Sequence, residues 1–209
     1  MKHLKALWAW LSRPSSSIAL GVLVGGGIVT GVIGWNAFEA TMHATSTDSF
    51  CLSCHELEVN IGVDFATRSH AVNASGVAAS CSSCHIPEPF VPHYVRKARS
   101  IGEVYHHVIG TIDTPEKFEA YRMHMATSVW REMQSNDSRE CRSCHDSDAW
   151  DVTLQSEKAQ EFHASSLGRG KTCIDCHKGI AHVLPAGIEE DSPIDAAATT
   201  THPSSEKES

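Results

Sequence analysis

The chain has 209 residues, a formal net charge of -8 and 14 histidines. Nucleic acid binding needs a basic face and none is seen, so we expect no nucleic acid partner; an acidic body instead suits a basic protein partner. The length allows one folded domain of about 150 residues, beside an apolar stretch near the N-terminus and a polar tail at the other end.

An uncharged stretch near the N-terminus predicts a membrane-spanning helix. No charged residue occurs from Pro14 to Phe38. Residues 18–38 are long enough to cross about 30 Å of hydrocarbon as a helix. A cleaved signal peptide shares the basic start, but its apolar core is only about 7 to 15 residues long, and no convincing cleavage site follows here. We therefore predict an anchor that stays uncleaved.

Basic residues set the expected orientation of this anchor. Because Lys2, Lys5 and Arg13 precede it, the positive-inside rule leaves residues 1–17 in the cytoplasm and places residues 39–188 outside. We expect a single-pass protein of the bacterial inner membrane, with its main domain in the periplasm. The anchor also contains two pairs of glycines four residues apart, a spacing that would let a second copy of the helix approach closely in a homodimer. These glycines are Gly21, Gly25, Gly27 and Gly31.

Eight cysteines form four C-x-x-C pairs, and a histidine follows each pair directly. No cysteine is left over, so disulfides or a zinc site explain the pattern less well than the signature of c-type haem attachment. Each motif supplies two thiols for thioether bonds and one proximal histidine for the iron. We predict four covalently bound haem c groups. The attachment cysteines are Cys51, Cys54, Cys81, Cys84, Cys141, Cys144, Cys173 and Cys176, and the proximal histidines are His55, His85, His145 and His177.

The motif spacing predicts two di-haem halves, at about residues 45–90 and 136–188. The first two motifs begin 30 residues apart and the last two begin 32 apart, whereas 60 residues separate the inner pair. A His-Ala pair precedes the second motif of each half, at His70 and at His163. This repetition indicates an old duplication.

Two helices are expected between the halves. Residues 92–109 and 115–134 both carry apolar side chains at spacings of three and four. The Asp-Thr-Pro-Glu segment at 113–116 predicts the start of the second helix, with a capping residue, a proline and a glutamate in its first turn. We expect the apolar faces of both helices to pack on haem.

No strand pattern of any length appears, so the fold is predicted to be mainly α: one transmembrane helix and a small multihaem domain of short helices and loops. Because few side chains are apolar, we expect the haems to form the core of residues 39–188. Residues 189–209 are rich in Ser, Thr, Ala and acidic residues, and are predicted to be disordered.

Sixth ligands for the four irons must come from outside the motifs. Of the ten other histidines, His70, His163 and His182 are best placed, because each lies in a short loop beside a motif. The alternative is a solvated loop histidine at each position. Two imidazole ligands favour a low potential, whereas a methionine ligand raises it.

Three segments resemble those of one protein family. They are TDSFC at 47–51, GTIDTPEKF at 110–118 and CIDCHKGIAH at 173–182. Together with the anchor they are similar to the NapC/NirT family of membrane-anchored tetrahaem c-type cytochromes, and the similarity runs from about Trp8 to Pro185.

The resemblance implies a quinol dehydrogenase, which oxidises menaquinol or ubiquinol at the membrane surface and passes electrons to a soluble periplasmic reductase. It also implies that His70, His163 and His182 are distal iron ligands, without indicating which haem each serves. Recipients in the family are nitrate, nitrite, trimethylamine N-oxide and dimethyl sulfoxide reductases. Because the chain ends soon after Pro185, without the extra haem domain of some trimethylamine N-oxide relatives, we expect nitrate reductase.

The first motif departs from the family pattern. Similar members often carry methionine two places after the motif histidine, as an iron ligand, whereas this chain has Leu57. Either Met42 or His43, just beyond the anchor, would then bind the iron, or the first haem has an open or water-filled site. The alternative is that Met42 and His43 line the membrane interface.

Quinol oxidation releases protons and therefore needs a proton acceptor. The candidates are Lys97 and Glu103, which lie on the first middle helix in the region that the resemblance places near the quinol site. The alternative is a solvated helix face. Two other classes of function stay open: an electron-transfer relay without its own quinol site, and a structural anchor that docks a reductase.

Overall fold

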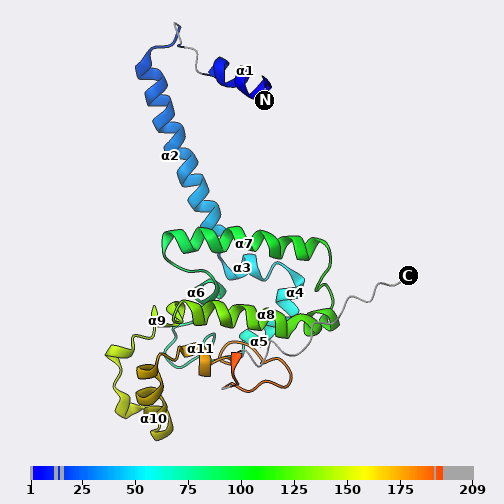
Figure 1. Ribbon diagram of the computed structural model, residues 1–209, viewed down its shortest axis with the longest axis vertical. Coiled ribbons are helices and arrows are strands. Elements are labelled where there is room, and N and C mark those ends of the chain that lie inside the picture. Colours follow the sequence, from blue (N-terminus) through cyan, green and yellow to red (C-terminus); the bar gives the residue numbers. More distant parts are fainter. Residues whose placement is uncertain (1, 12–13, 15–16, 191, 195–209) are drawn as a thin grey trace, which may run out of the picture. The chain divides into compact units, whose positions relative to one another are not determined.

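Figure 1 shows the computed structural model of the protein. It describes residues 2–11, 14, 17–190 and 192–194. These residues form helices joined by turns and loops, and no β-strand occurs among them. The prediction of a mainly α fold is confirmed. The chain divides into two compact units, Met1–Thr45 and Ser46–Ser209.

The first unit contains the membrane-anchor helix. Its elements are α1 (Lys2–Leu11) and α2 (Leu20–Ala44). α2 has 25 residues, a mean hydropathy of 1.5 and no buried side chain, so it is long and apolar enough to cross a membrane. A helix that is apolar on all sides and exposed is stable in lipid rather than in water. The helix extends past its predicted end at Phe38 to Ala44. Arg13, which was used to predict the orientation of the anchor, lies outside the described residues.

The second unit is built around two long helices, α7 (Phe90–Val108) and α8 (Pro115–Ser135) (Figure 1). The haem motifs lie on or beside short helices, which are α3 (Asp48–Cys51), α4 (His55–Leu57), α6 (Cys81–His85), α9 (Arg139–Arg142) and α11 (Cys173–Cys176). The remaining elements are η1 (Glu58–Gly62), α5 (Val63–Phe65), η2 (Ser147–Ala149), η3 (Val152–Leu154), α10 (Glu157–Ser166) and η4 (Leu167–Arg169).

A tight turn joins α7 to α8. Gly110 has a φ of +67°, a conformation that glycine adopts without steric cost. Lys117 closes the turn, because its Nζ donates to the Gly110 carbonyl (3.1 Å) and to Asp113 Oδ1 (2.6 Å). Thr114 caps α8 by accepting a hydrogen bond from the Lys117 amide (3.3 Å), and Pro115 begins the helix as predicted.

The apolar face predicted for α7 is exposed. The exposed fractions of Val95, Ile101, Tyr105 and Val108 range from 44% to 75%. α8 is packed more deeply than α7, since Phe118 and Trp130 on α8 are only 2% and 5% exposed. The protein side chains therefore cover α8 and leave the apolar face of α7 open.

The packed core is small. The buried hydrophobic side chains among the described residues are Phe118, Trp130, Ile174 and Ile194. Ile174 belongs to the fourth motif and contacts Trp130 of α8, so haem attachment and core packing share one site. Apolar burial on this scale is too little to hold a domain of this length by itself.

The packed region extends beyond the expected start of the tail. Ile194 is 5% exposed and joins the core with Trp130 and Ile174. Lys178 Nζ donates to the Glu190 carbonyl (2.9 Å). Residues 189–209 were expected to be disordered because they lack an apolar period, whereas Ile194 is packed in the core. The rest of the predicted tail, 195–209, lies outside the described residues.

We expect Ile194→Ala to lower the free energy of unfolding by about 2–5 kcal/mol, because it leaves a cavity against Trp130. The measurement is denaturant unfolding of the haem-loaded protein, followed by haem absorbance. Ile101→Ala is the control, since Ile101 is 71% exposed. Equal effects of the two substitutions would contradict the core position of Ile194.

Candidate haem sites

Short helices carry both cysteines of the second and fourth motifs, whereas only the first cysteine of the first and third motifs lies in a helix. Cysteines at positions i and i+3 of a helical turn lie on one side of it, so both thiols can reach one haem edge. Reciprocal capping bonds fix two of these turns, between Ser80 and Ser83 and between Thr172 and Asp175. Thr47 caps the first, accepting from the Phe50 amide (3.3 Å). None of the eight cysteines is in a disulfide bond.

A similar hydrogen bond links the two motifs of each half. In the first half, the Cys81 amide donates to Asp48 Oδ1 (2.8 Å). In the second, the Ile174 amide donates to Ser138 Oγ (3.1 Å). Asp48 and Ser138 each lie three residues before the first cysteine of their motif. The two acceptors are thus at equivalent positions, while the donors differ by one residue within their motifs.

The attachment thiols form a continuous series through the unit. Cys51 and Cys81 share a hydrogen bond, which lowers the pKa of Cys51 to about 7 and raises the pKa of Cys81. A bond between Cys141 and Cys173 likewise lowers the pKa of Cys173 to about 6 and raises the pKa of Cys141. Between the halves α6 packs on α9, where burial and then the charge of Cys144 raise the pKa of Cys84. Motifs one to four therefore follow one another in space.

Three motif histidines each face one of the predicted distal histidines. The ring centres are 6.1 Å apart for His145 and His70, 6.3 Å for His85 and His182, and 6.2 Å for His177 and His163. Two imidazoles on one metal have ring centres roughly 6 Å apart, because each bond is about 2 Å long and each ring centre lies about 1 Å behind its nitrogen. The spacing in all three pairs suits an iron between the rings.

Two of these pairs join one half of the chain to the other. His70 precedes the second motif but faces the third, and His182 follows the fourth motif but faces the second. The loop that carries His182 is held in place by the neighbouring Val183. Its amide donates to Asp64, and its carbonyl accepts from Arg122 Nη1 (3.4 Å). The side chain of Asp64 is itself fixed by Arg68 (3.0 Å).

The surroundings of these rings suit metal binding. Burial, and then the charge of His85, lower the pKa of His182 to about 4, so its ring is neutral at pH 7. His163 Nδ1 lies 2.7 Å from Gln155 Oε1, which leaves Nε2 for a metal. The Nδ1 atoms of His70 and His182 are buried without a hydrogen-bond partner in the described part of the chain. Such an atom is costly to bury in a protein that holds no ligand there.

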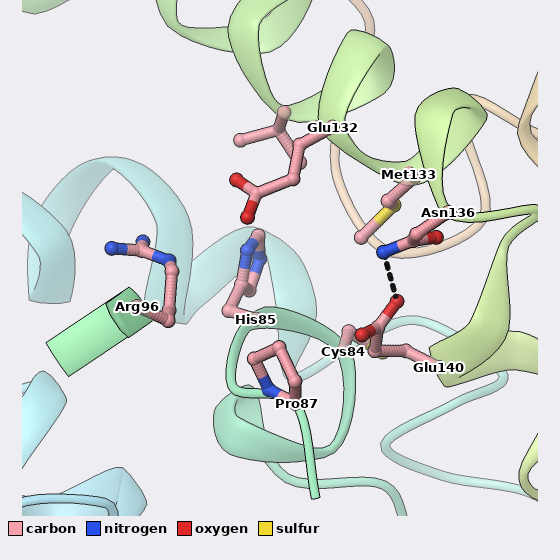
Figure 2. Close-up of a pocket in the computed structure, with 9 residues that line it drawn as sticks. Cys84, His85, Pro87, Arg96, Glu132, Met133, Asn136 and Glu140 are labelled. Carbon is pink, nitrogen blue, oxygen red and sulfur yellow. Dashed lines mark hydrogen bonds between the residues drawn. The ribbon is translucent and has the colours of Figure 1, made fainter. Parts of the chain in front are cut away.

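A pocket lies beside the second motif. Figure 2 shows how side chains of α6, α7, α8 and α9 surround it. Glu132 and Arg96 bring charges of both signs to this pocket, and Asn136 donates to Glu140 across one side of it (3.0 Å). The lining residues are Cys84, His85, Pro87, Arg96, Val129, Glu132, Met133, Asn136 and Glu140. An attachment cysteine and a motif histidine, Cys84 and His85, thus line the same pocket, and a c-type haem would bind to both.

The first motif is arranged differently. His55 Nε2 lies 3.2 Å from the Asp113 carbonyl, and its Nδ1 lies 3.3 Å from Glu56 Oε2. Glu56 is 3% exposed, and its Oε1 accepts from His107 Nδ1 (2.7 Å). Burial acts to raise the pKa of Glu56, but hydrogen bonds from its backbone and from His107 leave that pKa below its ordinary value. His107 did not stand out in the sequence, because it is the second of two adjacent histidines inside an amphipathic helix.

The remaining predicted site residues are Met42, Lys97 and Glu103. Met42 is on α2, in the other unit of the chain. On α7, burial lowers the pKa of Lys97, whose charge also acts on Cys51 of the first motif. Glu103 is 64% exposed at its side chain and forms an ion pair with Arg96 (2.8 Å). The structure therefore pairs Glu103 with Arg96, and the charges of both Lys97 and Glu103 act on Cys51 of the first motif.

Comparison with known proteins gives a family match over most of the chain. The model of the NapC/NirT cytochrome c family, N-terminal region, matches residues 13–187. The cytochrome c-type protein NapC of Escherichia coli K12 is 44% identical over 182 residues, 87% of this chain and 90% of that protein. The denitrification system component NirT of Stutzerimonas stutzeri is 41% identical over 183 residues, 88% and 91% of the two chains.

A third relative is a putative tetraheme cytochrome-c type protein of Allochromatium vinosum. It is 44% identical over 177 residues, which are 85% of this chain and 94% of that protein. No solved structure matches the chain.

We expect His70→Ala, His163→Ala and His182→Ala each to convert one low-spin haem of four to high spin, because each removes one imidazole facing a motif histidine. Electron paramagnetic resonance of the oxidised protein measures the change. His93→Ala is the control, since His93 Nδ1 is held by the Pro87 carbonyl (3.2 Å). If one of these variants kept the full low-spin signal, the histidine replaced in it would not be an iron ligand.

Proposed function

The chain belongs to the NapC/NirT cytochrome c family, and from that premise we propose that it oxidises quinol at the periplasmic surface of the inner membrane. It is a membrane-anchored tetrahaem cytochrome c that serves electron transfer to a reductase. Menaquinol or ubiquinol is the proposed donor. Bound haem c supplies a one-electron carrier at each motif.

The short tether between anchor and first motif carries this proposal. α2 ends at Ala44 and the first attachment cysteine is Cys51. Seven residues span at most about 25 Å even when fully extended. The first haem site is therefore held within reach of the membrane surface, where a lipid-soluble quinol is found. The series of paired thiols then leads away from that site to the fourth motif.

Features of α7 support a quinol site next to the first motif. Lys97 and Glu103 both act electrostatically on Cys51, so α7 lies beside that motif. Exposed apolar side chains on the same helix offer a surface to a quinol leaving the bilayer. They include Val91, Val95, Ile101, Val104, Tyr105 and Val108.

The acid–base groups of α7 are the proposed proton acceptors. Burial lowers the pKa of Lys97, which favours the neutral amine that can take a proton. Glu103 can accept a proton at its exposed carboxylate, and its ion pair with Arg96 holds it in position. We propose that both residues act on the quinol, and that the first motif receives the electrons.

The proposed recipient is a soluble periplasmic reductase, with nitrate reductase favoured. The relative described as a denitrification system component supports a role in the respiration of nitrogen oxides. The net charge of -8 suits a basic docking face on the partner. Reductases for nitrite, trimethylamine N-oxide and dimethyl sulfoxide are the alternative recipients. A homodimer through the glycines of α2 stays a prediction.

We expect Glu103→Gln to slow reduction by a quinol analogue by about 100-fold, because a positioned acid–base group contributes 10²–10⁴ to such rates. Reduction by dithionite should be unchanged. Stopped-flow haem absorbance measures both. Glu119→Gln is the matched control, since Glu119 is ion-paired with Arg122 on α8 (2.5 Å) and is exposed to a similar extent. Equal slowing with both reductants would argue for a structural effect instead.

The relay alternative predicts a different result with the unmodified protein. We expect the purified haem-loaded protein in detergent to be reduced directly by a quinol analogue at a rate that saturates with quinol concentration, because a dehydrogenase has its own binding site. The measurement is the initial rate of haem reduction against quinol concentration. A protein that dithionite reduces but quinol does not would be a relay that needs a separate membrane subunit.

A further inference from the structure

The iron of the first haem has no partner among the predicted distal histidines. His70, His163 and His182 each face a histidine of another motif. Leu57 cannot bind iron. Bis-imidazole coordination at the first motif would therefore need a histidine that the sequence did not single out.

We propose that His107 is the sixth ligand of the first haem iron, held in position by Glu56. This deepens the proposed function and rests on the four haem c groups assigned above. The ring centres of His107 and His55 are 6.4 Å apart, against 6.1 to 6.3 Å in the other three pairs. The ligand atoms of Cys54, Glu56 and His107 lie within 4.8 Å of one another, so His107 is directly beside an attachment thiol.

Glu56 selects which nitrogen of His107 is available. The Nδ1–H donates to Glu56 Oε1 at 2.7 Å, and that carboxylate is 3% exposed. Metal-binding histidines typically donate their second ring N–H to a carboxylate, which fixes the tautomer and the ring orientation. Nε2 of His107 is then the metal-binding atom. Because Glu56 directly follows His55, the group that orients His107 is part of the same haem site.

Iron binding by both rings requires His55 to exchange two contacts. Imidazoles on opposite faces of one iron have Nδ1 atoms roughly 8 Å apart, too far for one carboxylate to bind both. The 3.3 Å contact from His55 to Glu56 is the longer of the two and is the one released. The bond from His55 Nε2 to the Asp113 carbonyl is replaced by the bond to iron. The shorter bond, from His107, is kept.

Two other interpretations of this cluster are less well supported. Cys54, Glu56 and His107 could form a separate divalent metal site, but the thioether bond to haem uses the Cys54 sulfur and leaves two donors. Met42 could bind the first iron instead. A methionine ligand would give that haem a raised potential and a distinct spectrum, so the two ligands can be told apart.

The test is the spin state of the haem-loaded full-length protein. We expect His107→Ala to keep four haems by mass spectrometry but to lose one quarter of the low-spin resonance signal, with a matching high-spin signal that added imidazole converts back. His106→Ala is the matched control, because the neighbouring His106 is bound to Thr111 (3.0 Å). An unchanged spectrum in His107→Ala, or the loss of one low-spin haem in Met42→Leu, would overturn the proposal.

Two further variants keep the proposal testable if His107→Ala does not fold. His107→Met should keep the first haem low-spin with the near-infrared band of a His–Met pair, whereas a spectrum with four bis-histidine haems would overturn the assignment. Glu56→Gln should raise the potential of one haem without changing its spin state, because a neutral acceptor makes the imidazole a weaker donor. If the reduction potentials of all four haems were unchanged in Glu56→Gln, Glu56 would not position the ligand. Fewer than four haems on the unmodified protein would instead refute the tetrahaem assignment itself.

Discussion

Histidine–iron–histidine coordination is the interaction that we propose to hold the second unit together. Few of its hydrophobic side chains are buried, and the entropy lost on ordering such a chain is far larger than their burial can offset. Hydrogen bonds such as those to Asp48 and Ser138 align neighbouring motifs but add little net free energy. The imidazole pairs, by contrast, connect segments that are far apart in sequence. His182 and His85, for example, would be joined through one metal.

Local pattern was enough to predict much of this structure. The C-x-x-C-H motifs, the anchor and the two middle helices follow from spacing and periodicity, which are local properties of a sequence. α7 and α8 begin and end within two residues of the predicted limits. His70 and His182 lie in turns or loops beside a motif, as expected, whereas His163 lies within α10. All three face a motif histidine, and their role as iron ligands stays a prediction.

Tertiary contacts decided what the sequence left open. No local rule indicates that His70 faces the third motif, since this depends on how the two halves pack. Ile194 was expected in a disordered tail because a single buried side chain produces no period. His107 was hidden because α7 places it among solvent-facing residues, and only the buried Glu56 distinguishes it from His106. Glu103 was grouped with Lys97 by position, whereas its ion-pair partner is Arg96.

The proposed binding of His70 and His182 to the irons of the third and second motifs would also constrain how the protein is made. If the residues after the anchor cross the membrane in chain order, the second motif emerges long before His182, and His70 emerges before the third motif. Haem attachment at Cys81 and Cys84 can therefore precede completion of that iron's coordination by nearly a hundred residues of translocation. With these ligands, maturation would have to protect partly coordinated haems until the loop with His182 emerges. A chain truncated before residue 182 would then keep an incompletely ligated iron at its second motif.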